Sequence, residues 1–360
     1  MSVRHLGSLL VFSLAILAAI IPADAISNSA SVDLTTVLLG KPVEQHPIPA
    51  PPEWEPLLAT RGQVQEEHRM GLLPSSVGDY AVGPPPGVRT QQTLPLIVDL
   101  SWREPPVGDQ GEQNSCVGWA TAYYYKTFQE QREHGWSVAS TDHQFSPSFV
   151  YNQINGGYDK GSRISDALSL ILNKGVATWA VFPYFPYGSL PYWSLQPTTA
   201  QLQAALPYRA ATYGPFFNNN SPLVPMPYNN NLYYLKERLA SGDTLVIAFP
   251  IYTSFTHSGG YSSWACQYVY NGPYLFDSIQ GWHAVQVVGY NDYNSYFKII
   301  NSWGSSWGCQ GYGYLSYNFV TGRASEAWWM IDRLGDFTPT PTPYPIPARF
   351  RDFLPAVWRN

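Results

Sequence analysis

The chain has 360 residues, which is enough to bury one large core or two modest ones. Hydrophobic residues make up 45% and aromatic residues 15%, whereas only 12% are charged. This composition excludes a solvated disordered chain, because so much apolar and ring surface must be packed away from water. The net charge is −5 and Lys and Arg form no cluster, so nucleic acid is not an expected partner.

The first 25 residues are typical of an export signal. Arg4 and His5 precede an apolar run at 9–21, and residues 23–25 read Ala-Asp-Ala, a small-x-small cleavage pattern. The run is shorter than the roughly 20 residues that cross a bilayer core, which makes an uncleaved membrane anchor the weaker alternative. We therefore expect a secreted or cell-surface protein with no membrane span in its mature form.

The remaining chain divides into three stretches. Residues 26–93 are rich in proline and are expected to be either a pro-segment that blocks a cleft until its removal or an ordinary linker, with a helix only at 54–70. Residues 94–336 contain most of the periodic patterns and are expected to form the folded domain. Residues 337–360 begin with a Thr-Pro repeat, which indicates a stiff spacer and a C-terminal tail.

Within residues 94–336, helices are predicted first and strands later. The expected helices are at 116–134 (capped by Ser115), 164–174 (capped by Ser162 or Ser165) and 232–240, and the expected strands at 245–249, 284–288, 296–300 and 312–317. This order indicates an α+β protein with segregated layers. An asparagine-rich insertion near 215–231 separates the halves and contains a glycosylation sequon at 219–221.

The chain has three cysteines, Cys116, Cys266 and Cys309. In an exported protein this number predicts one disulfide bond and one reserved thiol, and the absence of C-x-x-C spacing argues against a metal site. Cys116 lies in the first turn of the helix at 116–134, where free N–H groups and the positive dipole end favour a thiolate. The alternative is that Cys116 is a small buried hydrophobic residue.

Two further residues give Cys116 a chemical context. His283 opens the strand at 284–288, and Asn301 ends the next strand. Each alone is more often structural, but adjacent antiparallel strands place such residues side by side. Together with Cys116 they supply a nucleophile, a general base and a residue that orients the base, which is what covalent acyl transfer needs.

Five stretches of the sequence form a specific set of motifs: Val98-Asp99-Leu100-Ser101-Trp102-Arg103, Asp109-Gln110-Gly111 to Ser115-Cys116, Asn155-Gly156-Gly157-Tyr158, Trp282-His283-Ala284-Val285, and Asn301-Ser302-Trp303-Gly304 to Trp307-Gly308. In these motifs and in their order, the sequence resembles the papain family of cysteine peptidases. The residues of these motifs are more similar to those of exported bacterial members than to those of plant or lysosomal ones. The resemblance implies two lobes, a helical N-terminal one and an antiparallel β-barrel-like C-terminal one, with the active-site cleft between them.

The resemblance also implies a role for each matched residue. Cys116 would be the nucleophile, His283 the base, and Asn301 the acceptor that fixes the tautomer of the ring. The side chain of Gln110 and the backbone N–H of Cys116 would form the oxyanion hole. The chain would then be an exported endopeptidase that works through an acyl-enzyme, with protein or peptide substrates, no cofactor, no metal and a monomeric state.

Four further residues are expected to contact substrate or to shield the catalytic residues. Gly156 and Gly157 would pair with the substrate backbone, where the missing side chains permit close approach. Trp303 would cover the His283–Asn301 pair, and Trp307 would line the leaving-group side.

Departures from the family pattern concern mainly the cysteines. The family has a cysteine three residues before the nucleophile and its partner just before the glycine segment, but here Gln113 and Ile154 occupy these positions. One bridge of the family is therefore missing, and by parity we hypothesise that Cys266 and Cys309 pair. Two other functions remain open: a catalytically silent binding protein with the papain fold, and an acyl transferase of transglutaminase type.

Overall fold

The structure is a computed structural model that describes residues 69–75, 82–88, 93–185, 192–218, 228–258, 266 and 268–334. All of them belong to the compact unit Glu44–Asn360. The predicted export signal, the sequon and the C-terminal tail lie outside the described residues, as does nearly all of the helix expected at 54–70. Among the described residues, no helix combines the length and apolarity needed to span a membrane.

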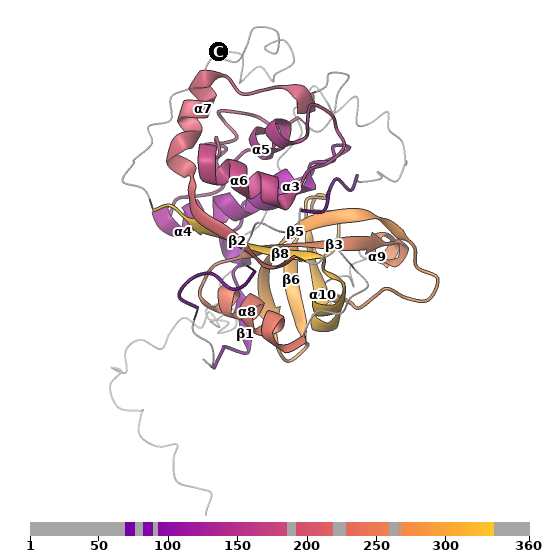
Figure 1. The fold of residues 1–360 in the computed structure, drawn as a ribbon. Helices are drawn as coiled ribbons and strands as arrows, with labels where there is room; N and C mark the ends of the chain where they lie inside the picture. Colours follow the sequence, from indigo (N-terminus) through magenta and orange to yellow (C-terminus); the bar gives the residue numbers. More distant parts are fainter. Residues whose placement is uncertain are drawn as a thin grey trace, which may run out of the picture. The chain divides into compact units, whose positions relative to one another are not determined.

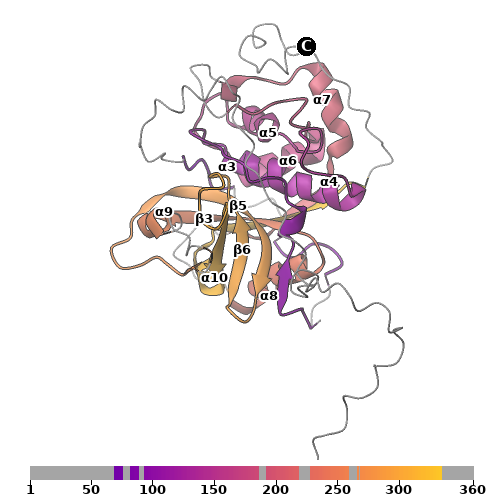
Figure 2. The same ribbon diagram turned by 180° about the vertical axis from the view of Figure 1, so that it is seen from behind.

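Helices form a layer on one side of a sheet (Figure 1), and the opposite view shows the same arrangement (Figure 2). This layer contains α3 (Cys116–Gly118), the π-helical η3 (Trp119–Lys126), α4 (Thr127–His134), α5 (Pro147–Ile154), α6 (Ile164–Lys174) and α7 (Thr199–Ala205). The first three form one continuous helical segment, which ends at Gly135 with φ 67°, a left-handed conformation that favours glycine. The helices predicted at 116–134 and 164–174 therefore have the expected bounds.

The sheet contains eight strands among the described residues. They are β1 (Ile97–Asp99), β2 (Ala210–Asn218), β3 (Leu245–Tyr252), β4 (Val269–Tyr270), β5 (Ile279–Asn291), β6 (Tyr296–Ile300), β7 (Tyr312–Ser316) and β8 (Glu326–Asp332). Their order is β2-β8-β3-β5-β6-β7-β4, with β1 paired to β5, and all pairs are antiparallel except β4 with β7. The expected barrel-like closure is not found in the described part of the chain: β2 and β4 end an open path and do not pair with each other.

The remaining helices complete the fold. They are the 3₁₀ helices η2 (Ser101–Arg103), η4 (Tyr192–Ser194) and η5 (Leu206–Tyr208), and the α-helices α8 (Tyr228–Ala240), α9 (Thr253–Ser258) and α10 (Tyr317–Arg323). The strand predicted at 312–317 ends at Ser316, because the Ser316 hydroxyl accepts the N–H of Phe319 and begins α10 instead. Ser115, predicted as a cap, makes no capping bond, and its hydroxyl contacts that of Tyr184 at 2.7 Å.

The alternation of side chains along β3 divides the hydrophobic core in two. Val246 and Ala248 pack against the helical layer, whereas Leu245, Ile247 and Phe249 pack on the face that α8 and α10 cover. A buried strand flanked by two apolar layers reads as a continuous hydrophobic run, which is how residues 245–249 appear in the sequence.

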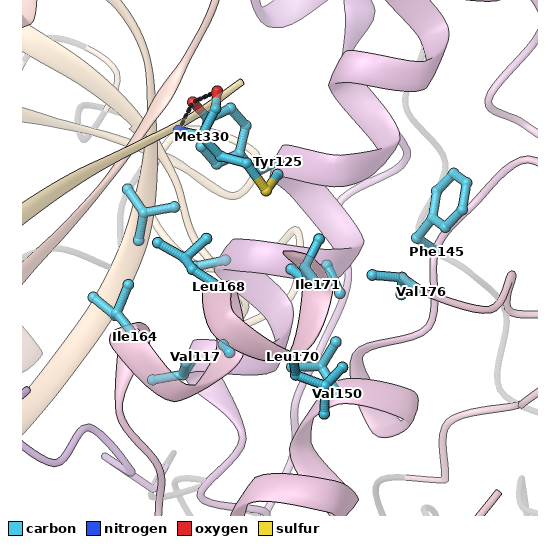
Figure 3. Close-up of a cluster of buried hydrophobic side chains, with 14 of the residues drawn as sticks. Val117, Tyr125, Phe145, Val150, Ile164, Leu168, Leu170, Ile171, Val176 and Met330 are labelled. Atoms are coloured by element: carbon cyan, nitrogen blue, oxygen red, sulfur yellow. Dashed lines mark hydrogen bonds between the residues drawn. The ribbon is translucent and has the colours of Figure 1, made fainter. Parts of the chain in front are cut away.

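The core under the helical layer also fastens that layer to the sheet. Figure 3 shows Tyr125 beside Met330 of β8, and Val117, Leu168 and Ile171 of the helices belong to the same core cluster. The Tyr125 hydroxyl accepts the backbone N–H of Met330 at 2.9 Å and donates to its carbonyl oxygen at 3.1 Å. Side chains on the first helical segment are thereby held in a fixed position relative to the strands.

A buried carboxyl group, that of Glu104, lies where the helical layer meets the sheet. Tyr123 of η3 and Gln286 of β5 are its neighbours. Burial, followed by repulsion from Asp243 and Asp99, raises the pKa of Glu104 well above its ordinary value. Burial thus favours the neutral form of this carboxyl in the folded protein.

Replacing Glu104 with Gln is expected to stabilise the protein at neutral pH. The raised pKa means that the free energy of unfolding is highest below the ordinary Glu pKa and falls as pH rises toward the folded-state pKa. The amide removes this loss, which we expect to be about 1–3 kcal/mol. Urea denaturation across pH measures it, with the exposed Glu112→Gln as the control, and an equal pH slope in E104Q and the parent would contradict the assignment.

Candidate active site

Cys116 is the first residue of α3, and its side chain is fully buried. It is the free thiol among the described cysteines, because Cys266 and Cys309 form a disulfide bond. Burial raises the pKa of Cys116 to about 11, although the N–H groups of Ala284 and Gly71 near the sulfur act in the opposite direction. The thiol is therefore protonated at neutral pH in this state of the molecule, and it lies against the strand that carries His283.

The ring of His283 is held in one tautomer by Asn301. His283 Nε2 lies 2.7 Å from Asn301 Oδ1, and both side chains are buried. The same oxygen accepts the backbone N–H of Ser302 at 2.8 Å, and a backbone N–H can only donate. The atom that faces the ring is thus an acceptor, so His283 carries its proton on Nε2. Nδ1 is then the ring nitrogen that can accept a proton.

Two tryptophans enclose the pair of His283 and Asn301. The ring of Trp303 lies 4.7 Å from that of His283, centroid to centroid, at an angle of 37°. Trp307 meets Trp303 edge to face, with centroids 5.7 Å apart, and both indoles are buried. Such an apolar cover excludes water from the hydrogen bond between the ring and the amide.

The side-chain amide of Gln110 is fixed in direction by its partners. Nε2 donates to the carbonyl oxygens of Gln113 and Arg69, both at 2.8 Å, and Oε1 accepts the Ser302 hydroxyl at 2.7 Å. Carbonyl oxygens only accept, so the assignment of the nitrogen is unambiguous. One N–H of Gln110 is therefore directed at a peptide carbonyl from another part of the chain, as an oxyanion donor would be.

That carbonyl belongs to residues 69–75, which we call the covering segment. Its backbone lies between the helical layer and β5: Leu72 N–H donates to the Trp282 carbonyl at 3.2 Å and Leu73 N–H to the Ser162 carbonyl at 2.9 Å. The Ser162 N–H in turn donates to the Gly71 carbonyl at 2.8 Å. Both pairings, with Trp282 and with Ser162, are parallel. In Figure 1 the segment is the indigo trace beside α3.

Glycines allow the covering segment to lie so close. A Cβ added to Gly71 would overlap the carbonyl oxygen of Asn114, and one added to Gly161 would overlap the carbonyl oxygen of Gly71. Gly161 has a φ of 91°, which also favours glycine. Because no side chain separates the backbones, the N–H of Gly71 comes within reach of the Cys116 sulfur.

The covering segment ends on a buried carboxylate. Ser75 N–H donates to Glu326 Oε1 at 2.8 Å, and Trp328 Nε1 donates to the other oxygen at 2.8 Å. The Ser75 hydroxyl accepts the N–H of Ser165 at 3.2 Å, so it satisfies the first turn of α6 from outside that helix. Leu72 is buried in the helical-layer core. The segment is thus held by its backbone, by one apolar side chain and by its last residue.

Most residues expected at the site are brought together here, but the glycine pair is not. Gly156 and Gly157 lie in an exposed turn, and the backbone that pairs with the covering segment is that of Ser162, six residues after Gly156. The sequence offered the Asn-Gly-Gly-Tyr motif but no signal for Ser162 or Glu326. The second glycine signal, Gly161, directly precedes the pairing residue and could have indicated it.

Carboxylates and a histidine also meet on α4. Glu130, Glu133 and His134 place ligand-type atoms within 4.8 Å of one another. The buried ammonium of Lys126 contacts Glu130 at 2.6 Å, so a cation of the chain already neutralises this group. The cluster lies at the opposite end of the helical segment from Cys116 and takes no part in the site.

Comparison with known proteins agrees with this geometry. The family model described as "Papain family cysteine protease" matches residues 98–329. An uncharacterized peptidase C1-like protein of Acanthamoeba polyphaga mimivirus is 26% identical over an alignment of 243 residues that covers 63% of this chain and 70% of that protein. A cathepsin B-like protein of Giardia intestinalis is 25% identical over 276 residues, 72% of this chain and 83% of the relative.

Solved structures resemble the fold as well. Xylellain, a cysteine protease from Xylella fastidiosa, superimposes with a TM-score of 0.59 at 26% identity and covers 74% of this chain and 98% of its own. The procathepsin B S9 of Trypanosoma congolense has a TM-score of 0.54 at 18% identity, covering 74% and 87%, and supports the fold alone. The chain therefore belongs to the papain family of cysteine proteases and is a cysteine peptidase that acts on peptides.

Proposed function

We propose that the chain is an endopeptidase in which Cys116, His283, Asn301 and Gln110 carry out the reaction. The observation that carries this proposal is the fixed tautomer of His283, whose Nε2 is committed to Asn301. That bond leaves Nδ1 to take the proton of the Cys116 thiol, which gives a thiolate and an imidazolium. Asn301 then stabilises the charged ring, and Trp303 keeps water from their hydrogen bond.

Acylation follows from these positions. The sulfur of Cys116 attacks the carbonyl carbon of the substrate, and the resulting oxyanion accepts from Gln110 Nε2 and from the backbone N–H of Cys116. The imidazolium of His283 passes its proton to the leaving amine, and the C–N bond breaks to leave a thioester. His283 next takes a proton from water as the water oxygen attacks the thioester. The C–S bond then breaks to release the acid product, and the imidazolium returns its proton to the Cys116 sulfur.

We further propose that residues 26–93 are a pro-segment, of which the covering segment is the inhibitory part. Its chain direction supports this role. The Arg69 carbonyl lies on Gln110, and the residues after it run along Ser162 and Trp282 in parallel. In a substrate, the residues that pair with these two stretches of backbone would precede the scissile carbonyl. The substrate would therefore run antiparallel to Ser162 and Trp282. The covering segment therefore fills the cleft in the direction opposite to a substrate and is not cut there.

The folded domain at 94–336 would then be released for work outside the cell. An export signal at 1–25 and the disulfide bond between Cys266 and Cys309 support a secreted or cell-surface location. The Thr-Pro spacer and tail at 337–360 suit a protein held at a distance from a surface. We expect a monomer that meets protein or peptide substrates.

Replacing Cys116 with Ala is expected to abolish peptide hydrolysis, by at least about 10³-fold in kcat, with the melting temperature unchanged. Hydrolysis of a fluorogenic peptide by the processed enzyme measures this loss, and Ser306→Ala, at an exposed position, is the control. Undiminished hydrolysis in C116A would remove Cys116 from the reaction.

The same assay separates the two other functions. A silent binding protein would show no hydrolysis in the parent chain. A transglutaminase-type enzyme would join an added amine to the acyl group faster than it releases acid.

Replacing Gly71 with Ala is expected to lift the covering segment. The added Cβ overlaps the Asn114 backbone, which destabilises the bound position of the segment by about 1–3 kcal/mol. Because the segment moves away to relieve this overlap, Cys116 should be exposed roughly tenfold more often. The rate of alkylation by iodoacetamide at neutral pH, measured on the unprocessed chain, reports this exposure. Leu73→Ala is the matched control, since Leu73 lies in the same segment with its side chain partly exposed. Equal alkylation rates in G71A and the parent would argue against the covering role.

A further inference from the structure

Asp159 carries a carboxylate that is held between α5 and the loop before α3. Its Oδ1 accepts the backbone N–H of Asn114 at 2.8 Å and the hydroxyl of Tyr151 at 2.5 Å. The side-chain amide of Asn114 also donates to the Asp159 carbonyl at 2.8 Å. The side chain of Asp159 is only 9% exposed. These hydrogen bonds and this burial fix the carboxylate in one position, unlike a charge that moves freely at the surface.

The peptide unit between Gln113 and Asn114 connects this carboxylate to Gln110. Its carbonyl oxygen accepts Gln110 Nε2 at 2.8 Å, and its N–H donates to Asp159 Oδ1 at 2.8 Å. Because the C=O and N–H of a trans peptide point in opposite directions, Gln110 and Asp159 lie at opposite edges of one peptide unit. The carboxylate is therefore close to the position that the oxygen of a scissile carbonyl would occupy.

Arg69 of the covering segment contacts both residues at once. Its carbonyl oxygen accepts Gln110 Nε2 at 2.8 Å, and its Nη1 lies 3.7 Å from Asp159 Oδ2. The side chain of Arg69 is 55% exposed and the separation is long, so this ion pair adds little to the binding of the segment. It nevertheless shows that an arginine side chain reaches Asp159 from a residue whose carbonyl lies on Gln110.

Asp159 lies on the side of the cleft that the residues before a scissile bond would occupy. The Tyr151 hydroxyl, which donates to Asp159, accepts the N–H of Gly161 at 3.3 Å. Gly161 directly precedes Ser162, whose backbone pairs with the covering segment. In the substrate direction proposed above, residues that pair with Ser162 precede the scissile carbonyl. Once the covering segment leaves, Oδ2 no longer has the Arg69 guanidinium and is open to a cation of the substrate.

We propose that Asp159 makes the enzyme selective for arginine or lysine at the substrate residue that provides the scissile carbonyl. The proposal deepens the function proposed above and rests on it, because it takes Gln110 as the oxyanion donor. A hydrogen bond between ionised groups is roughly twice as strong as one between neutral groups. Because Asn114 and Tyr151 already hold the carboxylate, binding of the cation costs little further ordering.

Matched peptides test this selectivity in the processed enzyme. Two fluorogenic peptides differ only in the residue before the scissile bond, which is arginine in one and citrulline, its uncharged isostere, in the other. We expect kcat/KM to be about tenfold higher for the arginine peptide, as one charge-assisted contact provides. Asp159→Asn should bring this ratio to within about twofold of one by slowing the arginine peptide alone. The amide still accepts from Asn114 and Tyr151, so the fold of the loop is retained.

Asp166→Asn is the matched control, because Asp166 is a carboxylate of α6 whose side chain is 45% exposed. It should keep the ratio of the parent enzyme. Equal hydrolysis of both peptides by the parent overturns the proposal without any variant, and so does an unchanged ratio in D159N. An equal loss for both peptides in D159N also overturns it, since Asp159 would then serve the fold. Retained hydrolysis in C116A would instead refute the proposed function, which the ratio of the two peptides does not test.

Discussion

The approach of the Gly71 backbone to the sulfur of Cys116 is the contact on which the state of the site depends. The thiol that it approaches is buried at the first turn of a helix, where an exposed thiol would be favoured as thiolate. Burial raises the pKa of Cys116 to about 11, so the sulfur of the proposed nucleophile is uncharged. The contact exists because glycine stands at both 71 and 161, which lets three stretches of backbone meet without side chains between them. If residues 69–75 act as the proposed inhibitory segment, they would keep the enzyme inactive by desolvating the thiol as well as by steric blocking.

The fold delivers the reactive groups from two separate layers. Cys116 and Gln110 belong to the helical side, and His283 and Asn301 to the sheet, where β5 and β6 pair directly. Their relative position depends on contacts that cross the junction, such as Tyr125 with the Met330 backbone. Ser302 adds a second crossing at the site, because it joins the end of β6 to Gln110. His283 and Gln110 are thereby both held by neighbouring residues at the end of one strand.

Local patterns predicted much of this arrangement, and contacts distant in sequence account for what they missed. The helices at 116–134 and 164–174 and the strand at 296–300 follow from periodicity and from Gly135 and Gly175, which end the helices. The strand at 284–288 is longer in the structure because its ends pair with Tyr252 and with β1, which no local pattern reveals. The cap of α6 was sought nearby but comes from Ser75, 90 residues away. The role of Glu326 was likewise not predictable from its neighbours in the sequence, because it binds the covering segment through Ser75.

The pH dependence of Cys116 alkylation, before and after removal of the covering segment, tests the central claim most directly. A specific protease site placed within residues 76–81 would allow the N-terminal piece to be cut and separated from the same preparation. With the segment in place, the rate should rise only in the strongly alkaline range, in line with the pKa of about 11. After its removal, alkylation should already be fast at neutral pH, with an apparent pKa of the thiol well below that value. Identical profiles before and after removal would contradict the account.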